Sequence, residues 1–263
     1  MGTDKRARQK ANRERARQER IRKQKLNKVR SRGLRFGLGI PVVVGALFLI
    51  ANLVVGDDDS TPSTDTAPPT SQPGELTPCP AVQGEGTRVA SFSGPMENCI
   101  DPTKSYTATF DTTEGKVVVE LDTKNTPGTV NNFVSLARYR YYDTTTIFRT
   151  DPSLDIIQGG GFSASDKFGY TIADEGTGFE YSEGDLVMAR SQGPNSGGAQ
   201  FFFVTGPNAS ALNGQGNYVT FGKITQGLNV VKAIQALHQP TDDGLGGKPN
   251  RTVTVNSVTI TEK

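Results

Sequence analysis

Hydrophobic and polar residues alternate over short stretches from about residue 106 to the C-terminus. Such alternation is typical of β-strands with one buried face, because successive side chains of a strand point to opposite sides. It predicts strands at residues 106–111, 116–122, 145–150, 154–158, 186–190, 200–205, 218–224 and 253–260. Apolar residues recur at helical spacing in residues 126–137 and 228–237, which predicts two amphipathic helices. Short strands with two helices favour a mainly β fold, a closed barrel whose ends the helices cover.

The first hundred residues carry a different pattern. Residues 36–56 contain no charged side chain, and a helix of this length, at about 1.5 Å per residue, spans the roughly 30 Å of a bilayer's hydrocarbon core. We interpret it as a single transmembrane helix that acts as a signal-anchor. A cleavable signal peptide is the alternative, but the basic region before it is long and no Ala-x-Ala pattern follows. Residues 57–103 form a linker rich in Asp, Ser, Thr and Pro, and the folded domain is expected at residues 104–263.

Charge is distributed unevenly along the chain. Residues 1–35 hold 15 basic and 3 acidic side chains, whereas the rest of the chain is net acidic. Because Lys and Arg are retained on the cytoplasmic side of a membrane, we expect a basic cytoplasmic tail, a single-pass protein of the cell membrane and an extracytoplasmic domain. The tail suits anionic lipid head groups, although it could be a topology signal without a partner. Nucleic acid is a weaker alternative and is not expected.

The linker contains both cysteines, Cys79 and Cys99. They are too few for a zinc site, and nothing around them resembles a nucleophile. In an oxidising compartment a disulfide between them would close a loop of about twenty residues and stabilise by about 3 kcal/mol, and we favour it over two free thiols. The one histidine, His238, is expected at an exposed helix end, and we expect neither a metal nor a cofactor.

Polar side chains interrupt three of the apolar strand patterns. Arg149 follows Ile147-Phe148, Gln158 follows Ile156-Ile157, and Gln200 opens a strand with three consecutive Phe residues. An amide beside phenyl rings costs free energy unless it is hydrogen-bonded, so a satisfied core Gln is the alternative to a binding role. Strands with Arg and Gln beside a Phe-rich strand predict one wall of a pocket.

The order of these motifs resembles the cyclophilin family of peptidyl-prolyl cis-trans isomerases. The resemblance spans about residues 104–261 and includes Phe-Arg, Ile-Gln-Gly-Gly, Met-Ala, Gly-Pro-Asn, Gly-Ala-Gln-Phe-Phe and Tyr-Val-Thr-Phe-Gly-Lys-Ile. It implies an eight-stranded antiparallel barrel capped by two helices, and an isomerase that assists the folding of proline-containing polypeptides. We expect a bacterial, membrane-anchored, monomeric form. A low-turnover chaperone or scaffold that binds proline peptides is the alternative.

The resemblance also implies roles for individual residues. Arg149 would stabilise the twisted prolyl amide, and Gln158 and Gln200 would hold the substrate carbonyl and orient Arg149. A structural ion pair is the alternative role for Arg149, and ordinary core packing is the alternative for each apolar residue. The proline pocket would be formed by Phe202, Ile156, Leu212 and Tyr218, and the backbone of Ala189, Arg190 and Ser191 would pair with the substrate.

Several positions depart from the family pattern. Phe148 replaces the usual His before the catalytic Arg, and Tyr218 replaces a His at the pocket rim. One residue is added between Arg149 and Gln158, so the family's proline-pocket Phe has no clear counterpart, and its position falls near Leu154 or Asp155. The Trp that animal cyclophilins use to bind cyclosporin is absent, and Ala211 falls near its place. We therefore expect weak drug binding and a low turnover.

Overall fold

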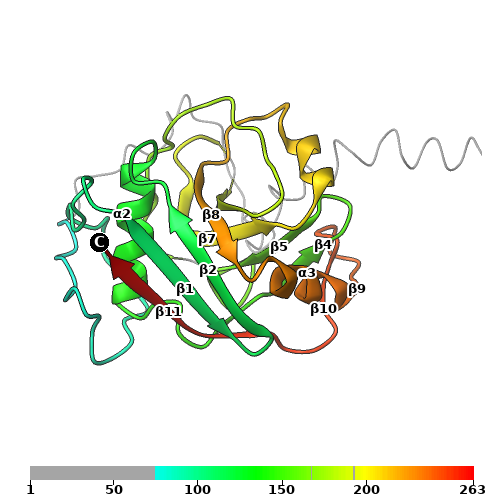
Figure 1. Cartoon of the computed structure of the whole chain (residues 1–263), viewed down its shortest axis with the longest axis horizontal. Coiled ribbons are helices and arrows are strands. Elements are labelled where there is room, and N and C mark those ends of the chain that lie inside the picture. The colour runs from blue at the N-terminus through cyan, green and yellow to red at the C-terminus, as the bar shows by residue number, and fades with distance from the viewer. Residues whose placement is uncertain (1–74, 167, 192) are drawn as a thin grey trace, which may run out of the picture. The chain divides into compact units, whose positions relative to one another are not determined.

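The computed structural model describes residues 75–166, 168–191 and 193–263, and its main element is a nine-stranded antiparallel sheet. The strand order is β3-β11-β1-β2-β8-β6-β7-β5-β4, and Figure 1 labels all of these strands except β3 and β6. The bounds are β1 Tyr106–Thr112, β2 Gly115–Leu121, β3 Thr145–Thr146, β4 Arg149–Asp151, β5 Ile156–Gly159, β6 Asp185–Arg190, β7 Gly197–Val204, β8 Thr220–Gln226 and β11 Thr254–Glu262. The mainly β prediction is confirmed.

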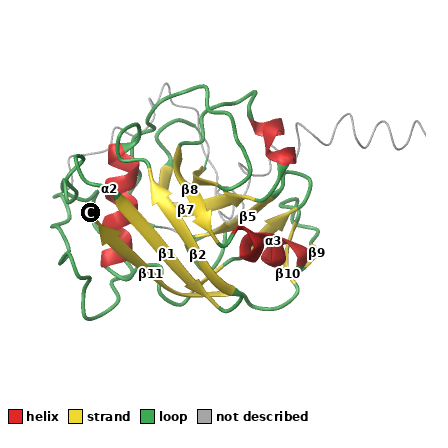
Figure 2. Cartoon of the chain, viewed as in Figure 1, coloured by secondary structure: helices red, strands yellow, loops and turns green. Residues whose placement is uncertain are grey.

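Two α-helices, α2 (Pro127–Arg138) and α3 (Leu228–Ala236), lie at opposite sides of the described unit (Figure 2). A 3₁₀-helix, η2 (Pro207–Leu212), follows β7. A small hairpin of β9 (His238–Pro240) and β10 (Gly247–Pro249) pairs separately from the large sheet. His238 opens this hairpin, is half-buried, and has Nδ1 2.9 Å from the Thr150 hydroxyl, so the prediction of an exposed helix-end His is wrong.

The prediction of a closed, eight-stranded barrel is also wrong. The predicted strand at residues 145–150 is interrupted at Ile147 and Phe148, and its two parts, β3 and β4, lie at opposite ends of the strand order. Within the described residues β3 and β4 form no ladder with each other, and an isolated bridge joins Thr146 to Gly161. The sheet is therefore an open half-barrel whose ends are joined by the chain itself rather than by a continuous ladder.

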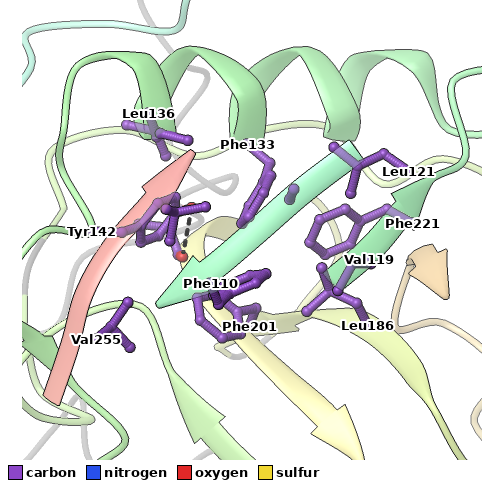
Figure 3. Close-up of a cluster of buried hydrophobic side chains, with 14 of the residues drawn as sticks. Phe110, Val119, Leu121, Phe133, Leu136, Tyr142, Leu186, Phe201, Phe221 and Val255 are labelled. Carbon is purple, nitrogen blue, oxygen red and sulfur yellow. Dashed lines mark hydrogen bonds between the residues drawn. The ribbon is translucent and has the colours of Figure 1, made fainter. Parts of the chain in front are cut away.

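The core lies between α2 and the inner face of the sheet, and aromatic rings fill most of it. Figure 3 shows Phe133 and Leu136 pointing from α2 toward Phe110, Tyr142 and Phe221 on the sheet side. Ring centroids lie 5.1 Å apart for Phe133 and Tyr142 and 5.2 Å apart for Phe133 and Phe221. Burial of these large apolar surfaces is the main driving force that holds the helix on the sheet.

The site-bearing strands alternate between two buried faces. Ile157, Leu186, Met188, Phe201 and Phe203 belong to the core cluster (Figure 3 labels Leu186 and Phe201). Their neighbours on the same strands are also buried but lie outside that cluster, because adjacent side chains of a strand point to opposite faces. These outer-face residues are Ile156, Val187, Ala189 and Phe202.

The segment before β1 packs on the folded unit. The predicted disulfide between Cys79 and Cys99 is confirmed. Asn131 of α2 accepts a hydrogen bond from the Cys99 amide at 2.7 Å, and Phe92 is buried in the core cluster with its ring centroid 5.2 Å from that of Tyr139. The disulfide thus closes a loop that also contributes apolar surface to the core.

In the part of the chain that the structure describes, no helix combines the length and apolar character needed to cross a membrane. The predicted basic tail, the transmembrane helix at residues 36–56 and the first part of the linker, to residue 74, lie outside the described residues.

Candidate active site

Strand register brings the predicted polar residues together on the outer face of the sheet. Arg149 of β4 pairs with Gln158 of β5, and Gln158 pairs with Phe202 of β7. Gln200 lies two residues before Phe202 and therefore on the same face of β7. Residues 42 positions apart in the sequence, Gln158 and Gln200, thus become neighbours.

The Arg149 guanidinium is held by three protein acceptors. Its Nε donates to the Leu245 carbonyl at 2.6 Å, Nη1 donates to Gln158 Oε1 at 3.1 Å, and Nη2 donates to Asp151 Oδ2 at 2.8 Å. The Arg149 side chain is only 2% exposed. Burial lowers the pKa of Arg149 and the Asp151 carboxylate opposes that shift, so the guanidinium stays charged at neutral pH.

The two glutamines extend this hydrogen-bond chain. Gln158 Nε2 donates to Gln200 Oε1 at 3.0 Å, and Gln200 Nε2 lies 3.3 Å from the carbonyl oxygens of Ser163 and Ala164. Each amide is therefore oriented by its neighbour, which satisfies polar groups that would be costly to bury unpaired. The resulting order is Arg149, Gln158, Gln200 and then the loop after β5.

A cavity of about 450 Å³ opens beside this chain. The three predicted polar residues line this cavity, and so do the three residues predicted to pair with the substrate. The first group is Arg149, Gln158 and Gln200, and the second is Ala189, Arg190 and Ser191. The wall also includes Leu245, Asp166, Phe168 and Tyr170, so it is partly apolar and partly charged. A concave, mostly apolar site with a few convergent polar groups is the usual form of a ligand-binding pocket.

The four predicted residues of the proline pocket are placed differently. Ile156, Phe202, Leu212 and Tyr218 are all buried, and none of them lines this cavity. The rings of Phe202 and Tyr218 meet edge to face at 5.8 Å. Within the described residues the buried Tyr218 hydroxyl has no hydrogen-bond partner. Phe202 and Tyr218 thus pack together, and Phe202 lies beside the cavity wall through Gln158, its strand partner.

Two charged residues on the cavity wall, Arg190 and Asp166, form hydrogen bonds with the surrounding loops. Arg190 donates through Nη1 to Asp174 at 2.9 Å and through Nη2 to the Gly193 carbonyl at 2.6 Å. Burial opposes ionisation of Asp166, but hydrogen bonds from the Ser163 hydroxyl and from the backbone of Phe162 and Ser163 outweigh it and lower the Asp166 pKa. Both charges therefore stabilise the loops that frame the cavity.

Asp155, the position near the altered proline pocket, has a structural role. Its carboxylate accepts hydrogen bonds from the Asn208 amide at 2.8 Å and from Gln235 Nε2 at 3.2 Å, and so ties η2 to α3.

Sequence reasoning missed two residues that contact Arg149. Asp151 could have been found, because it lies two positions after Arg149 on a strand and so shares its face. Leu245 carries no such signal, since it lies 96 positions away in a Gly-rich loop and contributes only its backbone carbonyl.

The geometry agrees with comparisons to known proteins. A family model described as cyclophilin type peptidyl-prolyl cis-trans isomerase/CLD matches residues 107–260. The chain belongs to the cyclophilin family. As predicted, it is a peptidyl-prolyl cis-trans isomerase, and the matched range contains Arg149, Gln158, Gln200 and the whole cavity wall.

Individual relatives support the assignment. Peptidyl-prolyl cis-trans isomerase cyp18 of Streptomyces antibioticus is 34% identical and is aligned over 59% of this chain and 98% of its own. Peptidyl-prolyl cis-trans isomerase B of Escherichia coli is 32% identical over 59% of this chain and 99% of its own. A crystal structure of a Cryptosporidium parvum cyclophilin, 25% identical, matches with a TM-score of 0.51 over 60% of this chain and 99% of that chain. The same protein has been crystallised in the presence of the dipeptide Ala-Pro.

Proposed function

We propose that this cyclophilin uses Arg149 to stabilise the twisted prolyl amide of proline-containing polypeptides. Rotation about an X-Pro bond breaks amide resonance and has a barrier of about 18–20 kcal/mol. Twisting localises a lone pair on the prolyl nitrogen, which then accepts a hydrogen bond that the planar amide accepts poorly. A guanidinium that donates there binds the transition state better than either planar form, which is the requirement for catalysis.

The observation that carries this proposal is the number of Arg149 N–H groups left for a substrate. A guanidinium has five N–H donors, and the three acceptors named above each take one. Among the described residues no partner takes the second N–H of Nη1 or of Nη2. Since Arg149 lines the cavity, these donors suit a substrate nitrogen.

Gln158 and Gln200 have complementary roles in this proposal. Gln158 orients Nη1, and Gln200 orients Gln158. A polypeptide bound along Ala189 and Arg190 at the end of β6 would bring its carbonyl groups toward these amides. The proline ring would bind against Phe202 and Tyr218, whose rings pack edge to face.

Arg149→Ala in the full-length chain tests the mechanism. We expect kcat/KM for a chromogenic X-Pro peptide to fall about 100-fold, as for loss of one preorganised transition-state donor. Arg140→Ala is the matched control, because the Arg140 side chain is 46% exposed, pairs with Asp143 and does not line the cavity. An Arg149→Ala enzyme as fast as wild type would refute the mechanism. Peptide binding without acceleration by the wild type would favour the chaperone or scaffold alternative.

We further propose that the enzyme acts on proteins outside the cytoplasm, as a membrane-anchored form. The support is the uncharged stretch at residues 36–56 after a tail with 15 basic residues, together with the Cys79–Cys99 disulfide, which is typical of oxidising compartments. Trapping thiols by alkylation in living cells tests the location. The two cysteines should resist alkylation until a reductant is added, whereas immediate alkylation of both would place the domain in a reducing compartment.

A further inference from the structure

Asp151 forms the most deeply buried ion pair among the described residues. Its Oδ2 lies 2.8 Å from Arg149 Nη2, and both side chains are only 2% exposed. Burying a guanidinium without a counter-charge is strongly unfavourable, so this carboxylate makes the burial of Arg149 tolerable. The two residues lie at positions i and i+2 of β4 and project from the same face.

The Asp151 carboxylate is itself fixed by the turn that follows β4. Oδ1 accepts hydrogen bonds from the Ser153 amide at 3.0 Å and from the Ser153 hydroxyl at 2.6 Å, which leaves Oδ2 for Arg149. Gly246 makes room for it, because a Cβ at Gly246 would stand 2.8 Å from Asp151 Cγ. The carboxylate therefore occupies one defined place before any substrate binds.

We infer that Asp151 is a positioning residue for the isomerisation, one that sets the direction in which Arg149 presents its two remaining N–H groups. The inference rests on the proposed role of Arg149. A guanidinium is planar, so acceptors on Nε, Nη1 and Nη2 together fix both its plane and its rotation. The Leu245 carbonyl accepts from Nε and Gln158 accepts from Nη1. Asp151 accepts from Nη2 and is the only one of these three acceptors that carries a negative charge.

Loss of the carboxylate would let Arg149 turn toward another acceptor. Asp243 is the nearby candidate, since its charge acts on Arg149 and its side chain accepts a hydrogen bond from the Leu245 amide at 2.9 Å. Removing a negative charge would also strengthen the pull of the guanidinium on the prolyl lone pair. We expect misplacement to outweigh this gain, because a shift of about 1 Å at a reacting group can cost on the order of 100-fold in rate.

The test compares Asp151→Ala and Asp151→Asn in the full-length chain. Asn keeps an oxygen acceptor without the charge, so kcat should fall about threefold for Asn and about tenfold or more for Ala, with KM less affected. Asp185→Asn is the matched control, since Asp185 is also buried and paired with Lys223 at 2.7 Å but does not line the cavity. The control should lose stability and keep the wild-type kcat.

A double-mutant cycle separates positioning from a merely structural role. In an Arg149→Ala background, Asp151→Asn should change kcat by less than about twofold, because Asp151 acts only through Arg149. The same threefold loss in that background would overturn the inference. So would wild-type kcat for both Asp151 variants when Arg149→Ala alone is impaired, which would leave the proposed function standing. Full activity of Arg149→Ala would overturn both.

Discussion

The inner and outer faces of strands β5, β6 and β7 are built from alternate residues of the same strands, yet different forces hold them. On the inner face, Phe201 and Phe203 are apolar and pack against other rings such as Phe110. On the outer face, Gln158 and Gln200 are polar and are held by hydrogen bonds in sequence. The inner face depends on the volume and fit of its side chains, whereas the outer face depends on the direction of each donor.

The largest effect is expected from breaking the inner face. Phe201→Ala removes a buried ring that contacts Phe110 at 5.4 Å and Tyr142 at 5.7 Å between centroids. The free energy of unfolding should fall by about 3–5 kcal/mol, as for other Phe-to-Ala changes in cores. Denaturant unfolding of the full-length chain measures it. A loss below about 1 kcal/mol would mean that the core repacks around the missing ring.

Phe202→Ala makes the same change one residue later, on the outer face. Among the described rings, Phe202 pairs only with Tyr218, so we expect a smaller loss of stability than for Phe201→Ala. Because Phe202 belongs to the proposed proline site, kcat/KM of the folded variant should fall about tenfold or more, since losing even one methylene-sized contact costs about tenfold. Unchanged kcat/KM would remove Phe202 from the site and leave it as packing.

Gly246→Ala tests how closely the outer face is fitted. Gly246 has φ +94°, and an added Cβ would press on the Asp151 carboxylate, whereas Gly184 has φ +90° and room for a Cβ. Both Ala variants should lose about 1–3 kcal/mol of stability through backbone strain. Only Gly246→Ala should also lower kcat/KM in the X-Pro peptide assay. Equal kcat/KM for the two variants would contradict the tight fit between Gly246 and Asp151.

The smallest effect concerns Tyr181, whose hydroxyl donates to the Tyr218 carbonyl and accepts from the Tyr218 amide. Burial raises the pKa of Tyr181 from 10.0 to about 12. Stability from this raised pKa is present below pH 10 and is lost as pH rises toward 12, because the unfolded chain ionises first. In Tyr181→Phe, the fall in the free energy of unfolding between pH 10 and pH 12 should be smaller than in the wild type, by on the order of 1 kcal/mol. An identical pH dependence in the variant would contradict this assignment.

Much of the inner face could be predicted from the sequence, because burial on one side of a strand leaves an alternating pattern. Phe110, Val117 and Val119 show it, and β1 and β2 follow within one residue. The break between β3 and β4 could not be seen, since Ile147 and Phe148 continue the apolar pattern while the chain changes position in the sheet. The β9–β10 hairpin was missed because its sequence contains several Gly and Pro residues and no alternating apolar pattern.

The outer face was predictable only in part. Arg149, Gln158 and Gln200 stand out as polar residues in apolar strands, and their order carries the resemblance to cyclophilins. Two contacts depend on tertiary packing between segments far apart in the sequence. These are the packing of Phe202 against Tyr218 and the hydrogen bond from Arg149 to the Leu245 carbonyl. Such contacts cannot be predicted from local sequence patterns.

The most direct test of the proposed mechanism is exchange NMR spectroscopy of an X-Pro peptide at equilibrium with the full-length chain. This measurement reports binding and cis-trans interconversion in one sample. With the wild type, we predict exchange between cis and trans signals that Arg149→Ala largely abolishes, while peptide signals still shift on binding. Exchange at the wild-type rate in the presence of Arg149→Ala would contradict a catalytic role for Arg149.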